Sequence, residues 1–377
     1  MKVVKYSPLL ILMTILACQS KKDSGLSSQH EISTQALFEN NIYRINEDGN
    51  NDSIATTLES RMEELNIPGV SITVFDNNQI LWSKGYGLKN KETGEKVNEN
   101  TIFQAASISK PVTSVAAFTL IENHKLALDE NVNLKLKRWQ VPENEFTEKE
   151  KVTLSRIMSH TSGLSTSGFQ GYCIKDSIPT LIEILRGSEI INSEPVRVVQ
   201  KPGESELYSG GGMEVLHMLM EDVSGKEFHQ LLDDLVLTSN GYDENGNVVC
   251  GGYHIYPEKA AAGLWASPSD LARFMIALGK SYRGEDTSLL KQSSAETMMT
   301  RVPNAGGIGI GIDGEGKAFR FRHTGGNAGF TCYAISFANT GRGVVIMTNS
   351  DNGFPLIHQI VRAVSRAYGW PPMFMGE

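Results

Sequence analysis

A serine and a lysine three positions apart open an apolar segment in the first third of the chain. Ser107 and Lys110 lie in the stretch FQAASISKPVTSVAAFTLIENHKL, where apolar residues follow the serine at helical spacing. Residues three apart share one face of a helix, so the amine of Lys110 can reach the hydroxyl of Ser107. Burial at a helix N-terminus would lower the pKa of the lysine and let it act as a base for a serine nucleophile. The alternative is a capping serine beside a surface lysine.

The pattern alone does not identify a site, because so short a motif also occurs by chance. The chain contains a second copy, Ser288 and Lys291, in the polar stretch DTSLLKQS. No other residue near that copy points to chemistry. We therefore predict that Ser107, and not Ser288, is the nucleophile.

Two later stretches strengthen this assignment. In PGESELYSGGGMEVLH, Tyr208 precedes a glycine run just ahead of a predicted helix. A tyrosine beside a lysine has a stabilised phenolate form and can shuttle a proton. In FRFRHTGGNAGF, His323 ends a predicted strand, and Thr324, Gly325 and Gly326 follow it. The glycines let a ligand approach the backbone, so we expect an exposed strand edge that can pair with a substrate backbone.

The three motifs together carry a family resemblance. Ser107-Ile108-Ser109-Lys110, Tyr208-Ser209-Gly210 and His323-Thr324-Gly325 occur in the order and spacing of the serine β-lactamase and penicillin-binding-protein superfamily. The chain resembles its class C-like branch, which also holds D-Ala-D-Ala carboxypeptidases and esterases. The stretches LSRIMSHTSGLS and AAGLWASPSDLARFM agree, and the resemblance covers roughly residues 52 to 370.

This resemblance implies an acyl-enzyme mechanism. Ser107 would attack a carbonyl, while Lys110 and Tyr208 accept and relay its proton, and Tyr208 would later activate water. The backbone N–H groups of Ser107 and Gly326 would form the oxyanion hole. The resemblance places Gly210, His323, Thr324 and Gly325 at the substrate, and it places His160 in a structural segment.

Two departures from the family pattern concern the substrate. Class C β-lactamases usually have an asparagine where this chain has Gly210, and that asparagine holds the amide of the substrate side chain. They usually have a lysine where this chain has His323. An unperturbed imidazole has a pKa of about 6.5, so we expect carboxylate binding to weaken as the pH rises.

The order of predicted elements indicates an α+β fold. A helix is expected from Asp52, capped by Asp52 or Ser53 and ended by Pro68-Gly69, followed by a hairpin over VSITVFD-NNQ-ILWSKGYG. Four short runs after Pro303 (GGIGIGID, KAFRFRH, GFTCYAISF and GVVIMTNS) read as antiparallel strands, and PLIHQIVRAVSRAYG reads as a closing helix. We predict an antiparallel sheet with both terminal helices against it, and a mostly helical second lobe. Within a catalytic domain of residues 51–377, the sheet lobe would take about 51–106 and 300–377, and the helical lobe about 107–299.

The first residues read as an export signal. Lys2 and Lys5 precede an apolar run that ends in Ile15-Leu16-Ala17-Cys18, which resembles a bacterial lipobox. Residues 1–18 would then be a lipoprotein signal peptide with Cys18 lipidated, and residues 19–50 a flexible tether. The protein would be exported and anchored by its lipid, facing the periplasm or the outside. The alternative is an ordinary secretory signal in which the cysteine falls by chance.

Composition excludes other classes of function. The formal charge is -8 and no basic run suggests a nucleic-acid partner. The eight histidines are scattered, so we expect no metal and no cofactor. Of Cys173, Cys250 and Cys332 at most two can pair within the chain, and the sequence does not say which.

We therefore predict a serine hydrolase that acts on an ester or amide carbonyl, in a D-Ala-type peptide, an ester or a β-lactam. Gly210 keeps a second interpretation open. The same fold could serve as a non-catalytic or slowly deacylating protein that binds cell-wall fragments or β-lactams.

Overall fold

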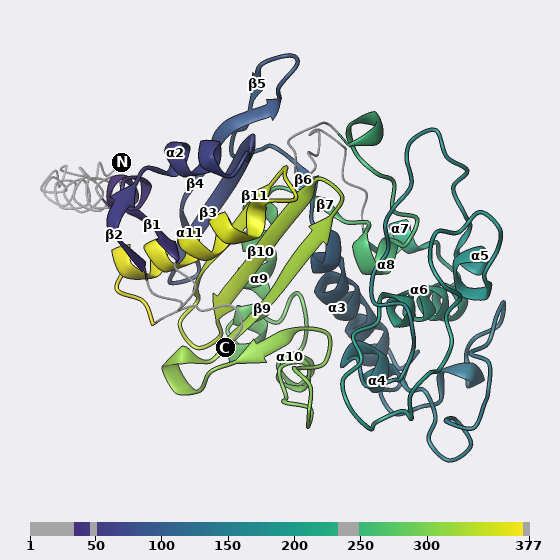
Figure 1. Cartoon of the computed structure of the whole chain (residues 1–377). Coiled ribbons are helices and arrows are strands. Elements are labelled where there is room, and N and C mark those ends of the chain that lie inside the picture. Colours follow the sequence, from purple (N-terminus) through teal and green to yellow (C-terminus); the bar gives the residue numbers. More distant parts are fainter. Residues whose placement is uncertain (1–33, 46–50, 233–248, 372–377) are drawn as a thin grey trace, which may run out of the picture.

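The computed structural model describes residues 34–45, 51–232 and 249–371. The predicted signal peptide and Cys18 lie outside this range. The described chain forms an antiparallel sheet with helices on both faces and a helical region beside it (Figure 1). The α+β prediction is confirmed.

The sheet joins strands from the two ends of the chain. Its order is β5-β4-β3-β11-β10-β9-β8, and neighbouring strands are antiparallel. Ile72 on β3 pairs with Ile346 on β11, which brings the early hairpin against the late strands. The strands are β3 (Gly69–Asp76), β4 (Gln79–Asn90), β5 (Glu95–Lys96), β8 (Gly311–Asp313), β9 (Arg320–Asn327), β10 (Phe330–Phe337) and β11 (Arg342–Thr348).

The predicted hairpin is β3 and β4. Asn77 and Asn78 connect the two strands, with φ of 47° and 62°. Two positive φ values match the turn that suits the twist of paired strands, and asparagine tolerates them better than most residues.

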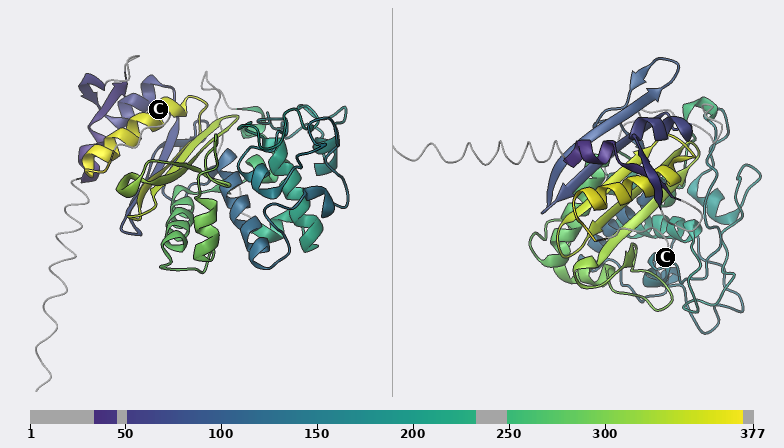
Figure 2. Two further views of the ribbon diagram at one scale, coloured as in Figure 1. Left: turned by 90° about the horizontal axis from the view of Figure 1, so that it is seen from below. Right: turned by 60° about the vertical axis from the view of Figure 1, so that its left-hand side comes forward.

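Helices cover the two faces of the sheet (Figures 1 and 2). Helix α11 (Gly353–Ala367) and α2 (Leu58–Glu64) share one buried apolar cluster with alternate residues of β10, such as Tyr333 and Ile335. Helix α9 (Pro268–Arg283) packs on the opposite face, where Cys332 and Ala334 point. The helical lobe is thus shorter than the predicted range of about 107–299, because α9 packs on the sheet.

The remaining helices lie beside the sheet, at the end where β6 (Phe103–Gln104) pairs with β7 (Trp265–Ala266). The apolar cluster under α9 continues through this region, so the two parts share one core. The helices are α3 (Ser109–Glu122), α4 (Leu154–Met158), α5 (Leu181–Arg186), α6 (Gly210–Ser224), α7 (Phe228–Leu232) and α8 (Lys259–Ala262), and α10 (Gln292–Met298) packs against α9.

Two predictions for the N-terminal part were wrong. Residues Asn51–Thr56 form strand β2, paired with β1 (Ile42–Ile45), and the helix begins at Leu58 with Thr57 as its cap. Residues 34–45 belong to the domain and not to the tether expected over residues 19–50, because they form a helix over residues 34–39 and strand β1. Phe38 and Ile42 are buried in the cluster under α11. Ile45 on β1 pairs with Asn51 on β2, and the strand was missed because Ile54, Leu58 and Met62 also fit helical spacing.

The predicted strand GGIGIGID forms only in its last part. Only Gly311–Asp313 forms a strand, and residues 306–310 form a loop. Gly309 has a φ of +88° and lies so close to Ser114 that a side chain would overlap it. The glycines therefore serve a tight loop and not a longer strand.

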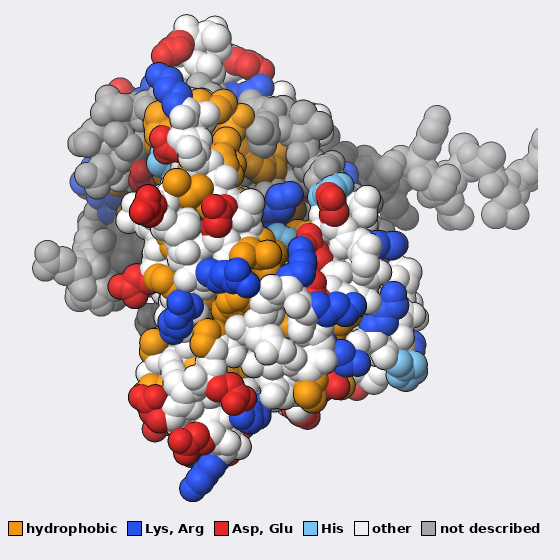
Figure 3. All heavy atoms as spheres, turned by 90° about the vertical axis from the view of Figure 1, so that its right-hand side faces the viewer, with side chains coloured by type: hydrophobic (Ala, Val, Ile, Leu, Met, Phe, Trp, Pro, Cys, Tyr) orange, Lys and Arg blue, Asp and Glu red, His pale blue; other side chains and the backbone are white. Residues whose placement is uncertain are grey.

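Within the described ranges, no helix is both long and apolar enough to cross a bilayer. Acidic and basic side chains are interspersed over the face that the helical region presents (Figure 3).

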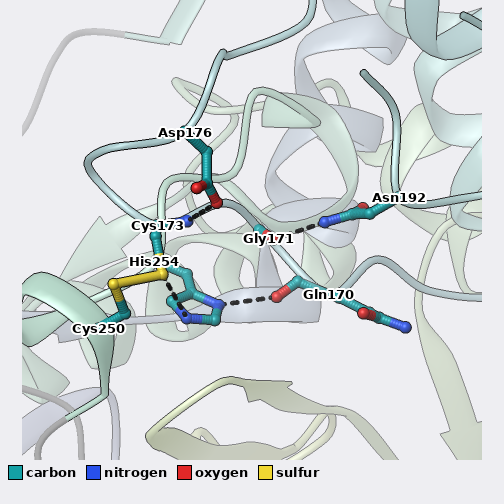
Figure 4. Close-up of a disulfide and its surroundings, with 7 residues drawn as sticks. All are labelled: Gln170, Gly171, Cys173, Asp176, Asn192, Cys250 and His254. Atoms are coloured by element: carbon teal, nitrogen blue, oxygen red, sulfur yellow. Dashed lines mark hydrogen bonds between the residues drawn. A yellow bond between two sulfur atoms is a disulfide. The ribbon is translucent and has the colours of Figure 1, made fainter. Parts of the chain in front are cut away.

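The cysteine pairing that the sequence left open is resolved. Cys173 and Cys250, 77 positions apart, form a disulfide with a Cα–Cα distance of 5.5 Å, while Cys332 is free and buried. Figure 4 shows His254 against Cys173, with its Nδ1 2.9 Å from the carbonyl oxygen of Gln170. The disulfide thus fixes the loop around residues 170–176 to the segment that leads into α8.

Candidate active site

The predicted catalytic residues meet in one cavity of ≈ 330 Å³ between the sheet and the helical region. Its walls come from the start of α3, the loop before α6, the strand β9 and the glycine loop before β8. The lining residues are Ser107, Lys110, Met158, Ser159, His160, Glu206, Tyr208, Met213, Gly306, Gly307, Gly309, Ile310, Gly311, Arg322, His323, Thr324, Gly325 and Gly326.

A tight turn presents Ser107 to the cavity. The chain leaves β6 and passes through one turn of 3-10 helix, Ala106–Ile108, before α3 begins. Ala106 has a φ of +47°, a left-handed conformation that costs about 1–3 kcal/mol for a residue with a Cβ. The hydroxyl of Ser109 donates to the carbonyl of Ala106 at 2.5 Å and accepts from the amide of Leu264 at 3.0 Å. These bonds hold the strained turn, so the nucleophile stands half-buried at the cavity wall.

Lys110 is buried directly behind the serine, with only 3% of its surface exposed. Its Nζ lies 2.9 Å from Ser107 Oγ and donates to the carbonyl of Ala261 at 2.9 Å. Burial lowers the pKa of Lys110 to about 7, and the carboxylate of Glu214 acts in the opposite direction. Part of the population therefore carries a free amine at neutral pH, and that amine can accept the serine proton.

Tyr208 reaches the same hydroxyl from the other side. Its ring lies under Lys110 Nζ, 4.9 Å from the ring centre. Burial raises the pKa of Tyr208 to about 12, although its hydrogen bond to Ser107 acts in the opposite direction. The phenol is thus protonated at neutral pH, so the lysine-stabilised phenolate expected from the sequence is not the resting form.

His160 holds this tyrosine in place. The two ring centres are 4.3 Å apart, and Nδ1 of His160 accepts from the amide of Ser209 at 3.2 Å. Burial is the main reason that the pKa of His160 falls to about 3, so the ring is neutral. Its contacts are those of a supporting residue for the Tyr208 loop.

Strand β9 forms the opposite wall. Strand β8 pairs with β9 only over Arg320–Arg322, so no described strand covers the outer edge from His323 onward. A Cβ at Gly325 would lie 2.4 Å from the carbonyl oxygen of Ala105 and 3.2 Å from Ala106 Cβ, because β9 packs closely against the turn that carries Ser107. This close approach brings Gly326 and Ser107 to one cavity, where their amides can face a common oxyanion.

His323 lines the cavity in a neutral form. Its Nδ1 is 2.6 Å from the carbonyl oxygen of Thr324, so this nitrogen carries the proton. Burial, and to a smaller extent the charge of Lys110, lowers the pKa of His323 to about 4. The expected weakening of carboxylate binding as the pH rises stays a prediction, and the lowered pKa of His323 would move it below neutral pH.

Gly210 does not line the cavity. Its amide donates to the carbonyl of Ser167 at 3.2 Å, and a Cβ there would lie 2.9 Å from the ring carbon Cε2 of Phe169. The ring of Phe169 thus occupies the space that a side chain at position 210 would need. The resemblance had placed Gly210 at the substrate, but Gly210 is not among the residues that line the cavity.

The second serine–lysine pair has no such surroundings. Ser288 and Lys291 are both exposed in the connection before α10, and neither lines the cavity. The amide of Ser288 donates to Asp286 Oδ1 at 3.0 Å, a local turn contact.

Several site residues escaped the sequence analysis. Glu206, Arg322 and the glycine loop line the cavity, and Glu214 lies behind Lys110. For Glu214 a signal existed, because an acidic residue stands inside the apolar stretch MEVLHMLM, three positions before His217. The others could be placed only once the chain was folded. Among the described residues no group of three or more His, Cys, Asp or Glu side chains is arranged to hold a metal ion.

Comparison with known proteins finds a family model and several relatives that match this chain. The family model described as Beta-lactamase matches residues 54–364. Protein flp of Staphylococcus aureus (strain MRSA252) is 23% identical over 332 residues, which cover 81% of this chain and 64% of that protein. The chain therefore spans a little less than two thirds of this relative. Esterase EstB of Burkholderia gladioli is 26% identical over 216 residues, covering 54% of this chain and 52% of that protein.

A solved structure shares the fold. The octameric penicillin-binding protein homologue from Pyrococcus abyssi superimposes with a TM-score of 0.67 at 24% identity, covering 84% of this chain and 77% of that one.

Proposed function

Because the chain belongs to the β-lactamase family, we propose that it is a serine hydrolase that forms an acyl-enzyme on Ser107 and hydrolyses an ester or amide. The observation that carries the proposal is the pair at the bottom of the cavity. Lys110 Nζ lies 2.9 Å from Ser107 Oγ, and its burial keeps part of it as a free amine at neutral pH. A nucleophile beside a base of matched pKa is what acyl transfer requires.

In the acylation step, Ser107 Oγ forms a bond to the substrate carbonyl carbon and gives its proton to Lys110 Nζ. The carbonyl electrons move to the oxygen, which the amides of Ser107 and Gly326 stabilise. When the tetrahedral intermediate collapses, the bond to the leaving oxygen or nitrogen breaks. Tyr208 donates its phenolic proton to that atom, and the Lys110 ammonium returns a proton to Tyr208.

Deacylation follows the reverse order with water as the nucleophile. Water adds to the acyl carbon, and its proton passes through Tyr208 to Lys110. The ester bond to Ser107 then breaks, and the serine oxygen takes its proton back from Lys110. The site returns to its starting state with the acid released.

The cavity favours a substrate that needs no fixed cation at position 323. His323 is neutral above about pH 5, because its pKa is about 4. Phe169 stands where an asparagine would hold the amide of a β-lactam side chain. Esters and uncharged amides therefore fit the site better than a β-lactam, and a relative carries the name esterase.

Rates on a panel of substrates test the proposal. We expect the full chain to hydrolyse p-nitrophenyl acetate or butyrate faster than a D-Ala-D-Ala peptide or nitrocefin. Ser107→Ala should lose at least about a thousandfold in kcat/KM, while the matched Ser288→Ala stays near wild type. Equal loss in both variants would contradict the assignment of Ser107. A stable adduct on Ser107 without turnover would instead support the slowly deacylating binding protein.

We also propose that the protein is an exported lipoprotein anchored through Cys18. The Cys173–Cys250 disulfide supports export, because disulfides persist in oxidising compartments. Incorporation of labelled palmitate in a bacterial host should depend on Cys18, so a Cys18→Ala variant that still carries label would refute the anchor.

A further inference from the structure

Hydrogen bonds run from Lys110 away from the cavity into the helical region. Lys110 Nζ donates to the carbonyl of Ala261, and the amide of Ala261 donates to Glu214 Oε1, both at 2.9 Å. The other oxygen of Glu214 lies 2.8 Å from His217 Nδ1, and His217 Nε2 lies 3.3 Å from Glu221 Oε1. The base is thus connected through one residue of α8 to a buried acid–histidine pair on α6.

Helix α8 is four residues long, so outside contacts must fix its position. Thr113 donates to the carbonyl of Ala260 at 3.2 Å, and Asn327 donates to that of Ala262 at 3.1 Å. Glu214 supplies the contact to Ala261 between them and is itself 0% exposed. Removal of this carboxylate would leave a buried amide without its acceptor next to the carbonyl that holds Lys110.

The charges around Lys110 make Glu214 the acid that acts on it. His160 and His323 face Lys110 as neutral rings at neutral pH, and Tyr208 faces it as a phenol. The carboxylate of Glu214 opposes the effect of burial on the pKa of Lys110.

Glu258 and His217 are titratable groups that face Glu214. Burial raises the pKa of Glu258, which lies at the start of α8, to about 8, so its carboxyl is neutral at pH 7. Hydrogen bonds to Glu214 and Glu221 outweigh burial and raise the pKa of His217, which favours its cation. Glu221 is itself paired with Arg138 at 2.7 Å.

We propose that Glu214 is a positioning residue for the base. Through Ala261 it fixes where Lys110 Nζ lies, and its charge stabilises the Lys110 ammonium. His217 orients the Glu214 carboxylate and partly neutralises its charge. The inference rests on the proposed function, because it concerns the base of that reaction. Glu214 touches neither Ser107 nor the cavity, so it acts only through Lys110 and Ala261.

The test uses the rate at which a fluorophosphonate phosphonylates Ser107, with loss of fluoride, measured from pH 5 to 9 on the full chain. In wild type this rate should rise with pH as Lys110 loses its proton. Glu214→Gln keeps the shape and an oxygen for the Ala261 amide, but removes the charge. The rising limb of its pH–rate profile should move to lower pH by about 0.5–1 unit or more, since loss of a nearby opposite charge disfavours the ammonium.

Two further variants separate this role from a merely structural one. His217→Gln removes the neighbouring cation and should move the limb the other way, to higher pH. Glu221→Gln, one contact further out on the same helix, should leave the limb within about 0.2 unit of wild type. Should Glu214→Gln fail to fold, the upward shift in His217→Gln alone decides.

An unshifted limb in both Glu214→Gln and His217→Gln, or an equal shift in Glu221→Gln, would overturn the inference while leaving the acyl-enzyme intact. If the probe does not phosphonylate Ser107 of the wild type at any pH, the proposed function itself fails.

Discussion

Gly210 offers a direct test of how the site is built, because the class C pattern that the sequence resembles has an asparagine there. A Cβ at position 210 would lie 2.9 Å and 3.4 Å from two ring carbons of Phe169 and 3.2 Å from the carbonyl oxygen of Ser167. Carbon atoms in contact normally stay about 3.5–4.0 Å apart. Gly210→Asn must therefore displace the ring, which is held by the loop that the Cys173–Cys250 disulfide anchors.

The magnitude follows from two opposing effects. Insertion of atoms into a filled site costs about 1–3 kcal/mol, and replacement of glycine in a helix returns up to about 1 kcal/mol. We expect Gly210→Asn to lower the free energy of unfolding by about 1–2 kcal/mol. In a Phe169→Ala background the ring is gone, so the same substitution should cost at least about 1 kcal/mol less.

Urea unfolding of the wild type, both single variants and the double variant measures this coupling. Nitrocefin assays on the same proteins should show that Gly210→Asn alone gives no gain in β-lactam hydrolysis, since its side chain meets Phe169 first. An equal cost of Gly210→Asn in both backgrounds would refute the reasoning.

Three shorter predictions follow from the same structure. On an uncharged ester, kcat/KM should rise through a pKa of about 7 as Lys110 deprotonates, so that at pH 5 about one hundredth of the plateau remains; a profile flat from pH 5 to 8 would speak against Lys110 as the base. Lys110→Met should abolish turnover and raise the melting temperature, most clearly below pH 7. The folded pKa of Lys110 lies below its unfolded value of about 10.5, so wild-type stability rises from pH 7 towards 10 and the advantage of methionine shrinks there; a lower melting temperature in the variant at pH 6 would contradict this. Cys173→Ser with Cys250→Ser opens a loop of 77 positions and should lower the free energy of unfolding by about 2–4 kcal/mol in urea titrations, and a loss below 0.5 kcal/mol would show that the loop is held by other contacts.

Local chemistry made part of this structure predictable. The Asn77-Asn78 turn and its flanking strands are a short-range pattern, so the hairpin could be predicted from a few residues. Ser107 and Lys110 could be paired because helical spacing alone brings them together. Tyr208 and His323 required the order of motifs along the chain, and the structure brings them to the same cavity.

Strand β2 was missed although its partner β1 is close in sequence, because Ile54, Leu58 and Met62 also fit helical spacing. The other features that the sequence did not reveal depend on contacts between distant residues. Helix α9 was assigned to the wrong lobe, since its apolar face does not say which surface it covers. The neutral state of His323 and the ring of Phe169 against Gly210 arise from burial and packing in the folded chain. Glu214 was overlooked because its partner, the amide of Ala261, is 47 positions away.

The most direct test of the central claim is the site of covalent labelling. The full chain is treated with a fluorophosphonate at pH 7.5, digested and analysed by mass spectrometry. We expect a single adduct on the peptide that contains Ser107, and none on that peptide in Ser107→Ala. Label on Ser288, or no label on wild type, would contradict it.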